Sequence, residues 1–295
     1  MVSLKQAVPL SLEHQSILTS IWKPMCINEN LQFSEYSFAN VFLFRREHKY
    51  VFIPGDPPCV RGEFAPNQYY FIPTCLPDQL KLESLKCAEG GMVCLFPIPD
   101  KWLKIFHECH PTVTSCRGDS DYLFMKSKLQ TLSGRVLSSR RNLLYQLQDK
   151  HDVESKPLTA TEIPQALEIL DAWLNHSKEP IEKTDYLQNK DALEFMERLN
   201  LFGRIVYADG EPIGFCIGEL ITPKTALMHF SKFLHNYKGV TPYIYQDFAN
   251  KLPESVEWIN LEQDLGIPSL RQAKESFAPD MLLTKWRLDL PIEDA

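Results

Sequence analysis

The stretch GRIVYADGEPIGFCIGEL at residues 203–220 decides the fold of the second half of the chain. Apolar and β-branched residues on both sides of Asp209-Gly210 predict two strands, because Asp-Gly is a strong hairpin-turn signal. Around this hairpin, the apolar periodicity predicts helices at 162–175, 191–202, 240–252 and 269–277, and strands at 226–233, 256–260 and 284–290. This order predicts a mixed sheet with helices on its faces.

The first half has a similar but looser order. Residues 41–53, around a turn at 45–49, predict a strand pair. Further strands are predicted at 68–72, 92–98 and 119–125, with helices at 78–89 and 100–110. A polar segment at 148–158 then predicts a boundary between two α/β domains, at 1–150 and 151–295.

The composition is that of a globular protein with packed cores, since 44% of the 295 residues are hydrophobic and 23% are charged. No apolar run approaches the roughly 18–20 residues of a membrane helix, and the N-terminus has no secretory pattern after Lys5. The eight cysteines form no C-x-x-C pair and are interpreted as mostly buried thiols. We therefore expect a cytoplasmic protein, which leaves a peripheral contact with the inner membrane face open.

Charge is unevenly distributed along the chain. The formal net charge is −7, with residues 1–150 summing to +3 and residues 151–295 to −10. An acidic protein does not coat nucleic acid through its overall field, so tRNA is not favoured as a partner by net charge. A basic stretch can still contact RNA phosphate or an anionic lipid head group, although a solvated charged face is the simpler reading. Its candidate residues are Lys128, Arg135, Arg140 and Arg141.

Five segments, taken together and in order, resemble one known family. They read SEYSFANVFLFR (34–45), DYLFMKSKLQTLSGRVLSSRRN (121–142), GFCIGE (214–219), YKGV followed by YIYQDFANKL (237–252), and WINLEQDLGIPSLRQAKESFAP (258–279). In this combination they resemble the family of the C-terminal domain of bacterial phosphatidylglycerol lysyltransferase. The resemblance covers about residues 5–290.

The resemblance implies two tandem GNAT acyltransferase-like domains, each a mixed central sheet flanked by helices. It also implies an acyl- or aminoacyltransferase with coenzyme A or aminoacyl-tRNA as donor and an amine or hydroxyl acceptor, on a small molecule or a lipid. The chain departs from the family pattern at Ser138 and Phe277. These departures favour an alternative, a catalytically inactive GNAT scaffold that binds a protein, peptide or lipid partner. The oligomeric state is not indicated.

Three carboxylates at or after predicted strand ends are the candidates for a general base. They are Glu219, Glu262 and Asp264. Deprotonation of an amine nucleophile suits a carboxylate whose pKa is raised by burial. The simpler alternative is that Asp264 caps a helix or turn and that Glu262 is solvated.

Two segments are candidates for holding the anionic part of a donor. The turn Lys238-Gly239-Val240 joins a strand to a helix, where a glycine lets backbone N–H groups approach a phosphate. Arg271 and Lys274 share one face of the helix that follows Asp264 and can grip a phosphate or a carboxylate. Alternatively, the turn is a plain helix start, and the two cations form internal salt bridges.

The histidines do not indicate a metal site or a catalytic site. The segment His107-Glu108-Cys109-His110 is not an H-E-x-x-H motif, and apart from Cys116 no second cluster is present, so we expect no metal site. His229, in the middle of a predicted strand, is interpreted as a core histidine with satisfied hydrogen bonds.

Overall fold

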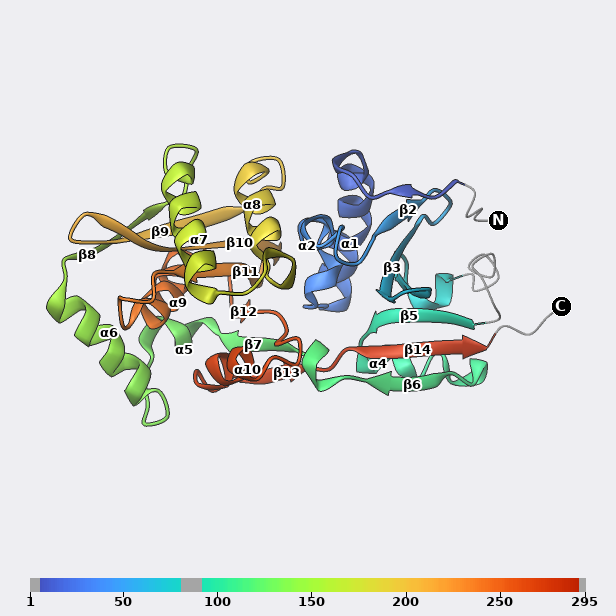
Figure 1. The fold of residues 1–295 in the computed structure, drawn as a ribbon. Coiled ribbons are helices and arrows are strands. Elements are labelled where there is room, and N and C mark those ends of the chain that lie inside the picture. Colours follow the sequence, from blue (N-terminus) through green and yellow to red (C-terminus); the bar gives the residue numbers. More distant parts are fainter. Residues whose placement is uncertain (1–5, 81–91, 292–295) are drawn as a thin grey trace. The chain divides into compact units, whose positions relative to one another are not determined.

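The computed structural model describes residues 6–80 and 92–291 (Figure 1). The chain forms two compact units, Met1–Asp121 with Leu283–Ala295, and Tyr122–Leu282. The helix predicted at 78–89 lies almost wholly outside the described residues. Within the described residues, each unit contains one sheet of seven strands.

The sheet of the first unit has the strand order β1-β2-β3-β4-β5-β14-β6. Its strands are β1 (Val8–Pro9), β2 (Val51–Ile53), β3 (Cys59–Ala65), β4 (Gln68–Ile72), β5 (Met92–Ile98), β6 (Thr112–Ser115) and β14 (Trp286–Pro291). The described part of this unit has the α-helices α1 (Gln15–Glu29), α2 (Phe38–Leu43) and α4 (Asp100–Leu103). Short 3-10 helices lie at Leu12–His14, Ser34–Tyr36, Pro77–Gln79, His107–Cys109 and Arg117–Asp119.

The strand pair predicted at residues 41–53 is wrong in its first member. Residues 38–43 form the helix α2, and only Val51–Ile53 is a strand. Every residue of α2 is buried, so its apolar run has no periodicity that separates a helix from a strand. The local signal for the helix is Ser37, whose Oγ accepts hydrogen bonds from the backbone N–H groups of Ala39 and Asn40.

The sheet of the second unit has the order β13-β7-β12-β11-β10-β9-β8. Its strands are β7 (Asp121–Met125), β8 (Val153–Pro157), β9 (Phe202–Ala208), β10 (Glu211–Thr222), β11 (Thr225–Phe233), β12 (Trp258–Asn260) and β13 (Met281–Leu283). The α-helices are α5 (Lys126–Thr131), α6 (Ser138–Lys150), α7 (Ile163–Ser177), α8 (Tyr186–Glu194), α9 (Val240–Lys251) and α10 (Pro268–Glu275), and a 3-10 helix lies at Ile181–Lys183. The predicted domain boundary at residue 150 lies inside this unit, between α6 and β8.

The predicted hairpin is confirmed as β9 and β10. Asp209 and Gly210 have φ angles of 54° and 84°, the left-handed pair that a two-residue hairpin turn requires. Helix α9 packs on the face of the sheet that carries Gly214 and Gly218, because a Cβ at either glycine would touch α9 side chains. Figure 1 shows α7 and α8 across the other face. The helix predicted at 191–202 lies earlier, at Tyr186–Glu194.

The two sheets repeat one pattern of strand directions. The first sheet is counted from β1 and the second from β8. In each, the first four strands pair antiparallel in succession, the fifth pairs parallel to the fourth, and the sixth pairs antiparallel to the fifth. The sixth strand is exchanged between the halves of the sequence. Strand β14, predicted to complete the second half, pairs with β5 and β6, whereas β7, predicted in the first half, pairs with β12. The alternation of a strand predicts its faces but not its partner, which is why the sequence assigned both strands to the wrong sheet.

Candidate functional site

The parallel strands β11 and β12 separate at a defined point in the second unit. They pair only over Thr225–Leu227 and Trp258–Asn260, although β11 continues to Phe233. Where the pairing ends, β11 also has a bulge against β10. The register shifts between Ile217 and Gly218, which leaves His229 as an extra residue. Bulges re-aim side chains and are frequent next to active sites, so this point in the sheet is a candidate position for a functional site.

A carboxylate–imidazole–carboxylate cluster lies at this point. The Nδ1 atom of His229 lies 2.8 Å from Oε1 of Glu262, and its Nε2 atom lies 3.0 Å from Oε1 of Glu219. Glu219 comes from β10 and points away from α9, because the neighbouring Gly218 faces α9 and successive side chains alternate. Glu262 comes from the loop after β12. The cluster is therefore formed by three segments: β10, β11, which carries the imidazole ring, and the loop after β12.

His229 is held as an imidazolium. Its side chain is fully buried, and burial alone would lower its pKa. The charge of Glu262 and the hydrogen bonds to both carboxylates outweigh burial and raise the pKa of His229 to about 10. Both ring nitrogens then donate, one to each carboxylate. The side chain of Glu219 keeps 14% exposure.

The loop that carries Glu262 is held by specific contacts. Glu262 has a φ of 59°, a left-handed conformation that costs free energy for a residue with a side chain. Its N–H donates to Oδ1 of Asn260 at 2.6 Å, and its carbonyl accepts from the N–H of Tyr122 at 3.2 Å. The ammonium of Lys274 donates to the same carbonyl and to its two neighbours, the carbonyls of residues 261 and 263. The carboxylate of Glu262 is thus presented to His229 by a fixed backbone.

Asp264 lies in the same loop but is fully engaged. Arg271 donates to both of its oxygens, at 2.8 and 3.0 Å, the Tyr122 hydroxyl donates at 2.6 Å, and the N–H of Gly266 donates at 2.8 Å. Burial opposes ionisation of Asp264, but these four hydrogen bonds hold its pKa well below its usual range. A carboxylate held in this way is a weak base. Among the three predicted carboxylates, the structure brings Glu219 and Glu262 together on His229 and gives Asp264 an anchoring position.

The predicted donor turn is packed against another helix. Gly239 has a φ of 97°, and a Cβ on it would lie 2.2 Å from the carbonyl oxygen of Leu143 in α6. Val240 is buried in the core of the unit. Lys238 is exposed. Close packing on α6 accounts for the glycine at this turn, and Lys238 is the member that solvent can reach.

The four basic candidates have different surroundings. Lys128 pairs with Asp280 at 2.6 Å, and Arg141 donates to two backbone carbonyls in the loop before α6. The guanidinium of Arg140 lies 5.8 Å from the ring centre of Phe277, and its Nε is buried. Arg135 is exposed. Only part of the predicted strip therefore faces solvent as free positive charge.

The interpretation of His229 as a core histidine with satisfied hydrogen bonds is confirmed, because the ring is buried and both nitrogens have partners. The sequence did not indicate which residues those partners are. A histidine in a buried strand is usually a satisfied core residue, and the two carboxylates that it meets lie 10 and 33 residues away. The usable signal was the charge itself, because Glu219 on β10 lies opposite Leu227 on β11, two residues before His229.

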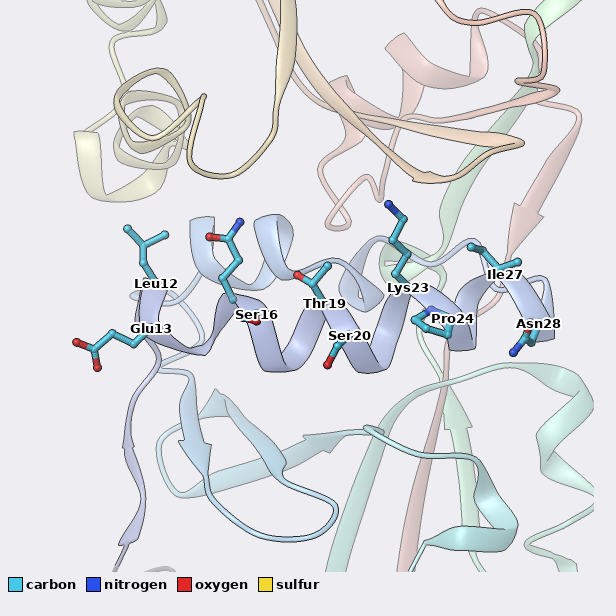
Figure 2. A pocket seen from close by; sticks show the side chains of 10 residues that line it. Leu12, Glu13, Ser16, Thr19, Ser20, Lys23, Pro24, Ile27 and Asn28 are labelled. Carbon is cyan, nitrogen blue, oxygen red and sulfur yellow. The ribbon is translucent and has the colours of Figure 1, made fainter.

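The described residues were also compared with three other kinds of functional feature: a surface hollow, a metal site and a membrane-spanning helix. A hollow of about 840 Å³ follows α1 in the first unit, and Figure 2 shows that its lining side chains come from one short stretch of chain around that helix. Within residues 6–80 and 92–291, no three His, Cys, Asp or Glu side chains form a group that could hold a metal ion. In the same ranges, no helix is long and apolar enough to cross a membrane.

The chain is similar to one protein family in sequence and to several solved proteins in structure. The family described as "Phosphatidylglycerol lysyltransferase, C-terminal" matches residues 29–288. No curated protein sequence matches the chain. A conserved protein of unknown function from Bacteroides thetaiotaomicron is similar in structure, with a TM-score of 0.84 and 23% identity over 98% of this chain and 100% of that one.

Two further solved structures share the fold at lower identity. L-PGS from Bacillus licheniformis has a TM-score of 0.57 and 13% identity, over 83% of this chain and 85% of its own. FemX has a TM-score of 0.57 and 6% identity, over 97% of each chain. The two mixed sheets with their flanking helices confirm the predicted α/β fold class, and both solved structures share this fold.

Proposed function

Because the chain belongs to the family of phosphatidylglycerol lysyltransferase C-terminal domains, we propose that it transfers an aminoacyl or acyl group to an amine or hydroxyl acceptor. The donor is aminoacyl-tRNA or an acyl-coenzyme A. The observation that carries the proposal is the cluster of Glu219, His229 and Glu262 at the point where β11 and β12 separate. It provides a carboxylate that solvent can reach, next to a fixed positive charge.

In this mechanism, Glu219 is the general base. The acceptor gives one proton to a carboxylate oxygen of Glu219, and its nitrogen or oxygen attacks the carbonyl carbon of the donor. The C–O bond of a tRNA ester, or the C–S bond of a thioester, then breaks, and the proton returns from Glu219 to the leaving group. His229 cannot act as the base, because its pKa of about 10 keeps it protonated. Its charge and Glu262 hold the Glu219 carboxylate in place.

For the donor, we propose contacts with the exposed cations of the second unit. Lys238 precedes the N-terminus of α9, and Arg135 is exposed before α6. Positive side chains of this kind suit phosphate groups of coenzyme A or of tRNA. A tRNA donor predicts that binding weakens steeply with added salt, because many counterions are released, whereas coenzyme A predicts a shallow dependence.

The test is a transfer assay with labelled aminoacyl-tRNA or acetyl-coenzyme A as donor and vesicles containing phosphatidylglycerol, or a panel of amines, as acceptor. Glu219→Gln should lower kcat by about 10²–10⁴-fold, the usual contribution of a general base, while donor binding stays unchanged. Glu254→Gln, at an exposed carboxylate, is the matched control. If wild type and Glu219→Gln transfer at equal rates, the proposed base is wrong.

A second function, a non-catalytic binding scaffold, is favoured by one observation. Arg271 and Lys274, the predicted donor-binding pair, are both engaged inside the unit, with Asp264 and with backbone carbonyls. On this hypothesis, the double variant Glu219→Gln with Glu262→Gln keeps the cellular function of the protein. Loss of function in a double variant that remains folded would reject the scaffold.

A further inference from the structure

The ammonium group of Lys274 is buried among three consecutive carbonyl oxygens. Its Nζ lies 2.6 Å from the carbonyl of Leu261, 3.1 Å from that of Glu262 and 2.5 Å from that of Gln263. An ammonium has three N–H donors, so these acceptors can take all of them. Lys274 retains only 7% exposure. An incoming phosphate would have to displace backbone contacts in order to reach it.

These contacts lie on the segment that needs support. Glu262 has a left-handed backbone, which persists only where surrounding contacts determine it. Lys274 supports the carbonyl side of this segment, and the Asn260 side chain supports its N–H side. The carboxylate of Glu262 leaves the same residue and meets His229 at 2.8 Å. Movement of the backbone at Glu262 would therefore move the carboxylate away from the imidazole.

We infer that Lys274 is a positioning residue of the Glu219–His229–Glu262 cluster, and that it holds the Glu262 backbone instead of binding a donor. The inference rests on the proposed function for its catalytic meaning, but its structural content does not depend on any substrate. Helix α10 thus contributes to the site through the hydrogen bonds of Lys274 to the backbone of the loop that carries Glu262. Removal of the ammonium frees the loop, and Glu262 loses its fixed distance from His229.

The experiment measures the pKa of His229 by NMR of ring-labelled histidine, with the signal assigned from a His229→Gln variant. In wild type, this pKa should be near 10, as the paired carboxylates dictate. In Lys274→Met, it should fall by about 1–3 units, because an opposite charge close to the ring contributes a shift of that size. Lys224→Met, at an exposed lysine of the same unit, is the matched control and should leave the value unchanged.

Because Lys274→Met removes a buried donor, Lys274→Gln provides a second variant that keeps an amide donor, and circular dichroism checks both folds. A folded variant of either kind with an unchanged His229 pKa would overturn the inference.

A further measurement uses the wild-type chain with an amine-acetylating reagent and mass spectrometry. Lys274 should resist labelling under native conditions, whereas Lys224 and Lys238 should react. Equal labelling of all three would also overturn the inference.

The two proposals fail in different ways. If the chain transfers nothing from either donor but Lys274→Met lowers the His229 pKa, the transferase is rejected and the positioning role stands. If transfer occurs and Lys274→Met raises the KM for the donor without changing the His229 pKa, Lys274 is a donor-binding residue, and the positioning role is rejected.

Discussion

Replacing His229 by glutamine should remove a pH dependence of stability that the wild-type chain shows in mildly alkaline solution. Burial lowers the pKa of this histidine, but Glu262 and Glu219 outweigh burial and raise it from 6.5 to about 10. A group whose pKa is higher in the folded state contributes its full stability below the unfolded value, and that contribution is lost as the pH rises through the folded value. The window for His229 therefore extends from about pH 6.5 to about pH 10.

Inside this window, the folded chain holds one proton that the unfolded chain lacks. The free energy of unfolding then falls by about 1.4 kcal/mol per pH unit, or about 3 kcal/mol between about pH 7 and pH 9. Urea unfolding followed by circular dichroism, at three pH values in this range, measures it for wild type and His229→Gln. Titration of other groups is common to both chains and cancels in the difference. The stability advantage of wild type should shrink steadily as the pH rises.

A constant difference between the two chains over this range would refute the reasoning, because it would mean that His229 does not hold its extra proton. His107→Gln removes an exposed histidine and serves as the control. Its curve should run parallel to that of wild type. A change of slope in the control would show that the assay responds to histidine content in general and not to the buried cluster.

Two further predictions concern packing and buried charge. Gly239→Ala should destabilise the second unit by more than about 2 kcal/mol, because strain at a φ of 97° adds to a clash with the Leu143 carbonyl. Gly210→Ala, at a φ of 84° but in open space, should cost only about 1–2 kcal/mol, and equal losses in urea unfolding would contradict the clash. Lys285→Met should cost about 3–5 kcal/mol near pH 8, because two buried carboxylates lose their cation. The loss should be smaller in acid, since burial raises the pKa of Glu35 to about 7, and a loss that is independent of pH would argue against this pairing.

The second half of the fold was predictable because its signals are local. The Asp209-Gly210 turn and the helical periodicity around the hairpin determine their own elements. Strand exchange was not predictable, since β7 and β14 look the same in sequence whichever sheet they join. Their partners are set by distant residues, through pairings such as that of Phe124 with Ile259. The α2 error has the opposite cause, because a fully buried run such as Val41–Leu43 lacks the alternation that prediction uses.

For the candidate site, the sequence indicated residue types and positions but not their partners. It named Glu219 and Glu262 as strand-end carboxylates, but it could not join them through His229, because a bulge and a loop bring the three together. It named Arg271 and Lys274 as one face of a helix, and their contacts are internal. The sequence does not distinguish a cation that binds a ligand from one that donates hydrogen bonds to backbone carbonyls of a nearby loop. Only the structure shows which acceptors it meets.

Among the described residues, each unit has a buried cation that lies between two carboxylates. In the first unit, Lys285 lies 2.7 Å from Glu35 and 2.6 Å from Asp121, at positions where the chain passes between the units. The side chains of Lys285 and Asp121 are fully buried, and that of Glu35 keeps 8% exposure, so the group stabilises the starts of β7 and β14. In the second unit, His229 is equally buried, but it lies where β11 and β12 separate, and Glu219 keeps contact with solvent. In the proposed mechanism, Glu219 is the carboxylate that exchanges a proton with the acceptor. On the proposed mechanism, the same arrangement of charges stabilises the first unit and supports the general base of the second.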